Sequence, residues 1–384
     1  MDWVKQYRYK KAIGLEPIVF VVVFFGIFGA IGSRMGVVNM LSTIMATAND
    51  LLMNTCFFLM AISVITGALS SLFSEFGFVA LIDKLLSRLI GPIYDMPGAS
   101  SLGVLNCYMS DNPAVLTLAK EDNFKRLFKK YQLPALTNIG TSFGMGLIVT
   151  ATVLAIPLEG AAMAALIGNL GAVIGSVVSV RLMLHFTKKV YGTTDYVETE
   201  HGENLPTGSR VVRSGGVGAR ILGSLLDGGK NGVEMGLAII PGVLVVCTMV
   251  MLLTHGPGPD GTYTGELGQG VPFLPWLGEK LSFILTPIFG FSNPEAVSVP
   301  ITALGAAGAA VGMAAKLVES GLANGNDLAV FTAMCMCWSG YLSTHIAMMD
   351  ALDTQEVTGY ALLSHTIGGL VAGAAAHFIY ILVM

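Results

Sequence analysis

Long apolar stretches alternate with short polar segments along most of the chain. Seven of these stretches approach the roughly 20 residues that an α-helix needs to cross the hydrocarbon core of a bilayer. The alternating segments of about 10 residues that are typical of a transmembrane β-barrel do not occur in the sequence. The pattern therefore predicts an all-α, polytopic membrane protein with crossings at residues 15–33, 53–75, 132–157, 160–187, 233–254, 327–348 and 358–383.

Two further apolar segments, residues 97–119 and 292–317, are interrupted by Asn, Asp, Pro and Gly. Each follows an amphipathic stretch, at 78–92 and at 275–290. Broken backbone at membrane depth is tolerated only where it is buried in protein or lines a wet cavity. We therefore predict two re-entrant helical hairpins, each of which enters and leaves on one side and faces a cavity.

The two halves of the chain resemble each other at a spacing of 195 residues. Pro92 and Pro287 are 195 positions apart, and each is followed by Ile and an aromatic residue. The same spacing relates residues 136–138 to residues 331–333. Self-similarity at long period in a membrane chain is typical of a transporter built from repeats. Each half has three complete crossings, and an odd number inverts the second half relative to the first.

Lys and Arg residues collect in cytoplasmic loops and so define the orientation. With a cytoplasmic N-terminus and two re-entrant hairpins, 18 of the 21 Lys and Arg residues lie inside, and Arg34, Lys280 and Lys316 lie outside. We therefore predict a multi-pass protein of the cell (inner) membrane. The predicted domains are an N-terminal transmembrane helix at 1–35, a first gate-domain repeat at 36–190, a cytoplasmic linker at 191–219 and a second repeat at 220–384.

Composition narrows the function classes. Charged residues make up 12% of the chain, against roughly 25% in soluble domains. A net charge of -4 and the absence of zinc-type spacings argue against nucleic-acid binding. No nucleophile elbow, phosphate loop or His-Glu-x-x-His motif occurs, so we expect neither an enzyme nor a cofactor. Cys335 and Cys337 would point about 200° apart on a regular helix, so we expect no metal site there.

The first hairpin carries a polar tip, whereas the corresponding tip of the second hairpin is made of small residues. Ser110, Asp111 and Asn112 match residues 305–307, which are Gly-Ala-Ala. An Asp within hydrocarbon depth costs about 2.5–3.5 kcal/mol on insertion scales, so it normally faces a cavity or a partner. We expect the polar tip to contact substrate or ion; the alternative is that it caps the broken helix.

Two predicted spans contain polar and glycine clusters that are typical of helices unwound midway. Freed carbonyls with Thr, Ser and Asn oxygens can replace the hydration shell of Na⁺. Single Ser and Thr residues in such helices more often bond back to their own backbone, which is the alternative reading. The candidates for ion coupling are Asn106, Thr137, Asn138, Thr141 and Ser142, and those for substrate binding in the second unwound span are Ser339, Ser343 and Thr344.

Further polar side chains begin the second hairpin and occupy the last spans. Asn293 and Glu295 flank Pro294. Glu295 can bind a ligand hydroxyl or amine, carry a coupling proton, or stand at the start of a helix at the interface. Histidine titrates near neutral pH, so a proton-coupled role is open as well as an interhelical hydrogen bond. The histidines concerned are His345, His365 and His377.

These features resemble nucleoside-recognition, or gate-domain, membrane proteins related to the core of concentrative nucleoside transporters. The resemblance covers residues 38–383: an amphipathic helix, a Pro-bearing interfacial helix, a hairpin, an unwound span and a final span, repeated with inversion. It implies that residues 110–112 contact a base-like group, that the second unwound span contacts hydroxyls, and that Na⁺ lies near Asn106, Thr141 and Ser142. The family's Gln-Thr-Glu tip is Ser-Asp-Asn here, which leaves the cargo open.

We therefore expect a secondary active transporter of a small polar metabolite, nucleoside-like and coupled to Na⁺ or H⁺, with alternating access around the hairpins. The alternatives are a non-transporting subunit of a membrane complex and a metal-ion permease. The expected partners are the lipid bilayer and a small-molecule substrate. Either a partner membrane subunit or a homo-oligomer is compatible with the sequence, and the resemblance implies a trimer.

Overall fold

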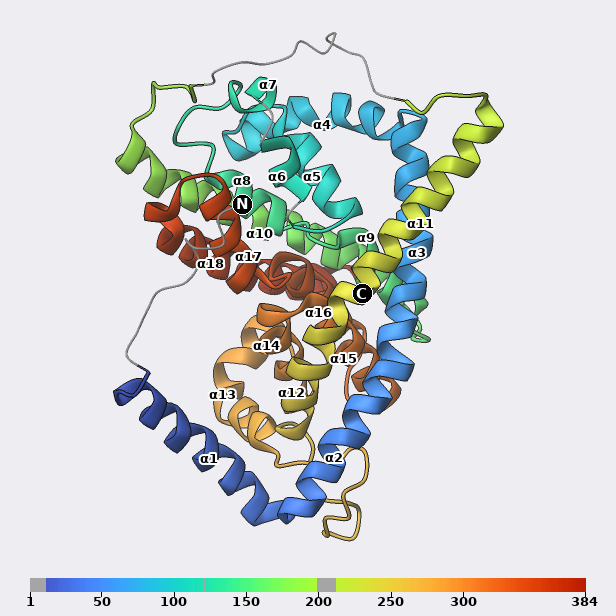
Figure 1. Cartoon of the computed structure of the whole chain (residues 1–384), viewed down its shortest axis with the longest axis vertical. Coiled ribbons are helices and arrows are strands. Elements are labelled where there is room, and N and C mark those ends of the chain that lie inside the picture. The colour runs from blue at the N-terminus through green and yellow to red at the C-terminus, as the bar shows by residue number, and fades with distance from the viewer. Residues whose placement is uncertain (1–11, 113, 120–121, 199–211) are drawn as a thin grey trace.

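The computed structural model describes residues 12–112, 114–119, 122–198 and 212–384, and these are almost entirely helical (Figure 1). In this described part, the pairing of Lys129 with Tyr196 is an isolated β-bridge, and no strand forms. Five helices there are long and apolar enough to cross a membrane: Leu15–Met35, Val37–Glu75, Ala135–Ala155, Ala161–Tyr191 and Gln355–Val383. The prediction of an all-α membrane protein is thereby confirmed.

Two long helices lie side by side along the right of Figure 1. The first comprises α2 (Val37–Asp50), a π-helical segment (Leu51–Cys56) and α3 (Phe57–Glu75). The second comprises α11 (Val217–Gly242), a π-helical segment (Val243–Cys247) and α12 (Thr248–Leu252).

Both long helices begin well before the predicted spans at 53–75 and 233–254. The polar pairs Asn49-Asp50 and Asn231-Gly232 lie inside continuous helix rather than at its start. Around Asn231, small residues let the two backbones approach closely, as is typical of membrane helices. Gly228 packs on Gly67, and Gly232 packs on the backbone of Ser63.

The remaining elements follow the same order in both halves. An amphipathic helix comes first, α4 (Phe78–Tyr94) or α13 (Phe273–Phe289), and a pair of packed helices follows. These pairs are α5 (Ser100–Met109) with α6 (Ala114–Ala119), here called hairpin 1, and α14 (Ser298–Gly305) with α15 (Ala307–Glu319), here called hairpin 2. A short α7 (Asp122–Lys125) follows hairpin 1, and a 3₁₀ turn (Pro294–Val297) precedes α14.

Each hairpin is followed by an interrupted helix and then by a long, continuous one. The interrupted helices are α8 (Ala135–Thr141) with α9 (Gly146–Ala155), and α16 (Gly325–Cys337) with α17 (Tyr341–Ala351). Both interruptions lie inside stretches predicted as unwound spans. The continuous helices are α10 (Ala161–Tyr191) and, after a 3₁₀ turn at Gln355–Val357, α18 (Thr358–Val383).

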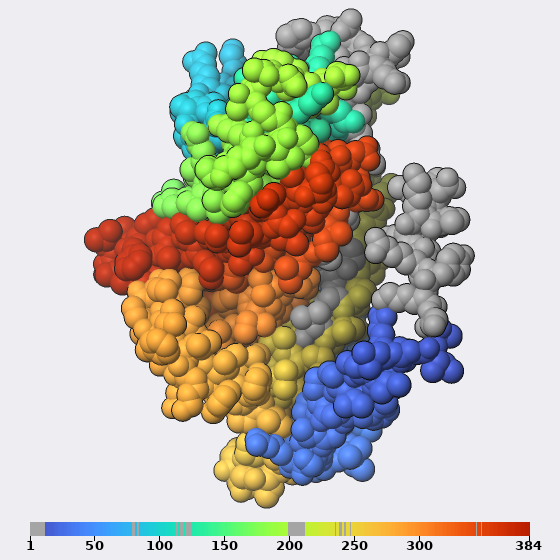
Figure 2. All heavy atoms as spheres, turned by 90° about the vertical axis from the view of Figure 1, so that its left-hand side faces the viewer, coloured from blue at the N-terminus to red at the C-terminus, as the bar shows by residue number. Residues whose placement is uncertain are grey.

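A central layer of α10, α16 and α18 separates the two hairpins, with hairpin 1 above it and hairpin 2 below it in Figure 1. In the side view of Figure 2, α18 crosses the middle of the molecule. Glycines make this packing close: Gly175 faces the backbone of Gly368, and Gly168 faces Thr332. The long helices α10 and α18 therefore form one support that both interrupted helices contact.

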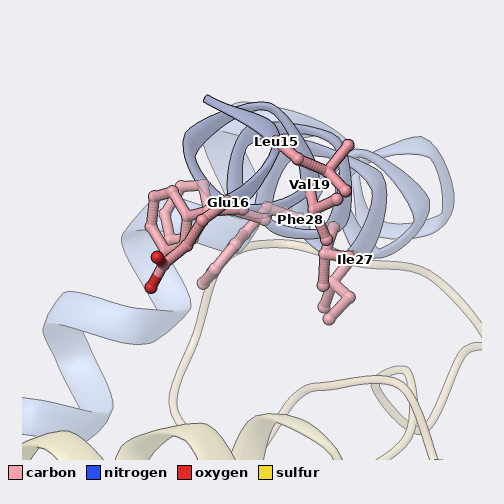
Figure 3. Close-up of a pocket in the computed structure, with 8 residues that line it drawn as sticks. Leu15, Glu16, Val19, Ile27 and Phe28 are labelled. Carbon is pink, nitrogen blue, oxygen red and sulfur yellow. The ribbon is translucent and has the colours of Figure 1, made fainter. Parts of the chain in front are cut away.

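The first helix, α1 (Leu15–Met35), lies apart from this body and packs on it mainly through its C-terminal end. Ile31 and Met35 are buried, whereas most of the remaining apolar residues of the helix are exposed. Figure 3 shows Leu15, Val19 and Ile27 lining an open apolar groove on this helix. Exposed apolar surface of this kind is suited to lipid, which fits the predicted first span.

Candidate functional site

The tip of hairpin 1 inserts between the two interrupted helices. Asn112 follows the end of α5 and is fully buried. Its side-chain amide donates to the Ser339 carbonyl in the interruption of α16–α17, and lies 3.5 Å from the Thr344 hydroxyl. A Cβ added at Gly144, in the other interruption, would collide with the Asn112 side chain. One buried amide therefore contacts both interruptions at once.

The two interruptions also touch each other, and they do so at positions related by the 195-residue spacing. The Cys337 thiol lies 3.8 Å from the Ser142 carbonyl. A Cβ at Gly144 would lie 3.0 Å from Cβ of Ser339. Contact between equivalent residues is what an approximate two-fold relation between the halves produces at its axis, and repeat-built transporters place their sites there.

Hairpin 2 reaches the same place through its backbone. The Gly340 amide donates to the Ala303 carbonyl at 3.0 Å. A Cβ at Gly340 would lie 3.2 Å from the Gly305 carbonyl oxygen, and Gly340 has a φ of 61°, which favours glycine. We call the meeting point of Asn112, Gly144, Ser339, Gly340 and Gly305 the crossing.

Buried polar atoms without a hydrogen-bond partner gather at the crossing. In the described part of the chain these include Oδ1 of Asn112 and Oγ of Ser339, whereas the unpaired Nε1 of Trp338 faces Gly369 on α18. Such atoms are rare, since an unpaired buried polar group costs about 1–3 kcal/mol, and each calls for a specific explanation. The set contains donors and acceptors and no formal charge, so it is suited to a neutral molecule with mixed hydrogen-bonding groups.

Ser110 and Asp111 lie beside this set and are partly exposed. The Asp111 carboxylate accepts from the backbone amide of Asn112 at 2.7 Å, and its carbonyl accepts from the Ala114 amide at 2.9 Å. Neither bond is an N-cap bond to the second or third amide of a helix, so both interpretations of Asp111 stay predictions. Because the bond from the Asn112 amide uses Oδ1, the other carboxylate oxygen can accept from a ligand.

Ser110 also lines a polar cavity of about 340 Å³ that runs from the tip of hairpin 1 along α3 and α11. Serine hydroxyls and one amide dominate its wall: Ser70, Ser71, Ser74, Ser110 and Asn231. Arg213 and Glu75 form an ion pair of 2.8 Å at this cavity. Bonding to Glu75 raises the pKa of Arg213, so its charge is fixed. The cavity gives the tip of hairpin 1 a hydrophilic approach.

The residues predicted for ion coupling are grouped around α8, with one exception. Thr137, Asn138, Thr141 and Ser142 are fully buried, whereas Asn106 lies on α5, one turn before Ser110. Their polar atoms mostly have partners already. The Asn138 amide donates to the Ser179 hydroxyl at 2.9 Å, and Ser142 bonds back to the Asn138 carbonyl at 2.8 Å.

The polar residues at the start of hairpin 2 lie elsewhere. Asn293 donates to the Leu322 carbonyl at 2.9 Å, so it ties the two ends of hairpin 2 together. Glu295 lies on the 3₁₀ turn before α14, eleven positions ahead of Ala306 at the tip. Within the described residues, neither side chain bonds to a member of the crossing. The side chain of Ser343 lies outside the described part, although its backbone belongs to α17.

Several residues of this region were not singled out from the sequence. Gly144 shapes the crossing, and Tyr108 bonds the Thr150 hydroxyl at 3.1 Å and the side-chain oxygen Oδ1 of Asn169 at 3.0 Å. A tyrosine within a broken apolar hairpin is a signal that could have been used, because a buried phenol needs a partner. The contact of Gly144 with Asn112 depends on two separate elements and leaves no local signal.

The histidines form part of the support behind the second interruption. His365 lies 3.0 Å from the Ser179 hydroxyl through Nδ1 and contacts the Cys337 carbonyl through Nε2. Its ring centroid is 4.6 Å from that of His345. His377 bonds the Asn326 side chain at 2.8 Å, away from the crossing. The contacts of His365 and His377 fit the interhelical hydrogen bond that was one of the two interpretations, whereas both ring nitrogens of the buried His345 lack a hydrogen-bond partner among the described residues.

Comparison with known proteins gives a fold and no family. No family model matches the chain, and no curated protein matches it. The chain resembles solved structures of CNTnw, a concentrative nucleoside transporter, at 14% identity. For the inward-facing substrate-bound state the TM-score is 0.54, with 98% of this chain and 94% of that chain covered. For the outward-facing state of a doubly substituted CNTnw variant it is 0.52, with 99% and 94% covered. The chain therefore has the fold of this transporter.

Proposed function

We propose that this protein is a secondary active transporter that moves a small, polar, nucleoside-like molecule across the membrane by alternating access at the crossing. The observation that carries the proposal is the convergence of both hairpin tips on one helix interruption: Asn112 on Ser339, and Ala303 on Gly340. A ligand at such a point can be released to either side by movement of one hairpin or the other. The same fold in CNTnw is recorded in inward-facing and outward-facing states.

The chemistry of the crossing favours a neutral, hydrogen-bonding cargo. The unpaired atoms of Asn112 and Ser339 offer a donor and acceptors, and Asp111 adds a carboxylate that can accept N–H or O–H groups. A nucleobase edge and sugar hydroxyls present the complementary groups. Thr344 lies close enough to Asn112 to join the same set. A strongly anionic cargo would be repelled by Asp111.

We further propose that the buried oxygen-rich segment around α8 couples transport to Na⁺ or H⁺. Thr141 and Ser142 end α8 directly beside hairpin 1, where Gly140 packs on Val115. Carbonyl oxygens at an interrupted helix are suited to Na⁺. Uptake into liposomes under a Na⁺ gradient alone and under an H⁺ gradient alone separates the two ions. Equal uptake with and without either gradient would reject coupling.

Asp111→Asn tests the transport site. We expect uptake of radiolabelled uridine or adenosine into proteoliposomes to fall at least tenfold, because a charge-assisted acceptor for the cargo is lost. Asp350→Asn is the matched control, since Asp350 is exposed on α17 and bonds Gln355. Full uptake by Asp111→Asn, with folding and insertion of both variants normal, would reject the site.

A further inference from the structure

An ion pair joins hairpin 2 to the first long helix, whose residues Val37–Glu75 are long and apolar enough to cross a membrane. Lys316, in the last turn of α15, contacts the carboxylate of Asp50, which ends α2. Asn54 donates to the other carboxylate oxygen at 2.7 Å. The Asp50 side chain is 15% exposed and that of Lys316 is 25% exposed. Charges at membrane depth are costly and are usually retained for function.

The pair is one of three contacts along a single face of α15. Ala309, Gly312 and Lys316 follow each other at the spacing that places residues on one side of a helix. The Ala309 carbonyl accepts from the Cys247 thiol at 3.2 Å, and a Cβ at Gly312 would collide with Thr55. This face of hairpin 2 is therefore fitted to both long helices.

All three contacts fall on or beside the π-helical segments. Thr55 lies within Leu51–Cys56, Asp50 precedes that segment, and Cys247 ends the segment Val243–Cys247. Such segments are rare in proteins and are frequently found at functional sites. The two segments also contact each other, so hairpin 2 rests on the place where both long helices depart from regular α-helix.

We propose that Asp50 and Lys316 form an electrostatic latch that fastens hairpin 2 to the long helices and must open for hairpin 2 to move. They are positioning residues, because they act on the hairpin and not on cargo. The proposal rests on the alternating access proposed above. The tip of hairpin 2 has no polar side chain to hold it, since its contact with Gly340 is made by backbone alone. The ion pair at its base is thus a charged contact that joins it to the long helices, in addition to its apolar packing.

The latch is reachable by water. A cavity of about 200 Å³ is lined by Lys316 together with Thr254, His255, Glu319 and Ser320. His255 and Glu319 are the other ionisable groups of this wall, and Asn54 is the polar neighbour of Asp50. A pair in contact with a polar cavity can be hydrated when it separates, which lowers the cost of opening compared with a fully buried pair.

The native Cys247 reports whether the latch is closed, because its thiol is buried beneath Ala309. We expect Lys316→Gln to raise the rate of maleimide labelling of Cys247 about tenfold in membranes, as measured by peptide mass spectrometry. Cys335 and Cys337, which are buried in α16, are internal controls and should keep their rates. Lys130→Gln is the control variant, since it removes an exposed ion pair with Glu198.

Two double variants separate a latch from a merely structural ion pair. Asp50→Asn/Lys316→Gln leaves no unpaired charge, so a structural role predicts normal Cys247 labelling. If the pair is a latch, Cys247 labelling stays about tenfold faster than in the native protein. The attraction between Asp50 and Lys316 is lost, even though the double variant leaves no unpaired charge. The charge-swapped Asp50→Lys/Lys316→Asp should return labelling toward the native rate. Native labelling in the neutral double variant would overturn the proposal.

The labelling result does not depend on the identity of the cargo. If native protein fails to take up uridine or adenosine but the variants change Cys247 labelling as expected, the proposed cargo fails and the latch stands. If uptake is observed and labelling is unchanged in every variant, the latch fails and the transport proposal stands.

Discussion

The two hairpins occupy equivalent places in the two halves, yet they are held by opposite means. Hairpin 1 is held at its tip, where the Asn112 side chain bonds Ser339 and fits against Gly144. Hairpin 2 contacts the crossing through the Ala303 carbonyl, a backbone group, and carries an ion pair, Lys316 with Asp50, at its far end.

This difference indicates that the two hairpins have different roles, although they occupy equivalent places in the two halves. A side chain at the tip of a hairpin can select cargo, because its hydrogen-bonding groups are specific. A tip of small residues allows close approach of backbone and ligand but offers little selectivity. A distant anchor controls when such a tip can move. We therefore interpret hairpin 1 as the element that recognises cargo and hairpin 2 as the element whose movement is controlled electrostatically.

The largest effect is expected from crowding hairpin 1 out of the crossing. Gly144→Ala places a methyl group where the Asn112 side chain lies, so the tip must be displaced. We expect a loss of about 3 kcal/mol in the free energy of unfolding, as in overpacked cores, together with loss of cargo binding. Gly91→Ala is the control, because nothing lies within 4 Å of a Cβ there. Thermal unfolding in detergent measures the stability of both variants. An unchanged unfolding midpoint for Gly144→Ala would refute the close contact between Gly144 and Asn112.

Removal of the tip side chain itself should have an intermediate effect. Asn112→Ala leaves the buried Ser339 carbonyl without this donor, at a cost of about 1–3 kcal/mol. Affinity for uridine or adenosine, measured by scintillation proximity, should fall about tenfold or more. Asn39→Ala removes comparable bonds, to Met35 and Tyr263, far from the crossing, and should lower stability but leave affinity unchanged. Equal affinities in the two variants would remove the asymmetry between the hairpins.

The smallest effect is expected at the backbone contact of hairpin 2. Gly340→Ala forces a left-handed conformation on a residue with a Cβ, which costs about 1 kcal/mol, and places that Cβ 3.2 Å from the Gly305 carbonyl. Gly160→Ala carries the same backbone strain without a close neighbour and is the control. We expect similar unfolding midpoints for both variants, but weaker cargo binding only for Gly340→Ala. A large loss of stability for Gly340→Ala alone would show that hairpin 2 is also held firmly at its tip.

Local sequence patterns predicted most of the helices and both helix interruptions. The apolar stretches placed most long helices, and the interruptions near Ser142 and Ser339 followed from clusters of Gly, Ser and Thr. They failed at the starts of the long helices, which begin at Val37 and Val217 and not at the predicted residues 53 and 233. Polar residues remain in helix there because the packing of α3 on α11 and the pairing of Asp50 with Lys316 stabilise them, and neither partner is local.

The structure brings only some of the predicted site residues together. Asn112, Ser339 and Thr344 meet as a group, whereas Asn293 and Glu295 lie at the other end of hairpin 2. Thr137 and Asn138 precede Gly144 by only a few residues. Their side chains already donate to the Pro134 carbonyl and the Ser179 hydroxyl, respectively. Residue type and spacing indicate which groups can bind a ligand, but not which of them are already paired within the fold.

By itself, the sequence determined the helical membrane class, the repeat at 195 residues and the contrast between a polar and a small hairpin tip, because these depend on local hydrophobicity and on comparison of the chain with itself. Only the tertiary structure decided that both tips meet at one interruption, that Gly144 makes room for Asn112, and that Lys316 reaches Asp50 across 266 residues. Those contacts join elements far apart in the chain, so their energies depend on packing geometry that no local pattern contains.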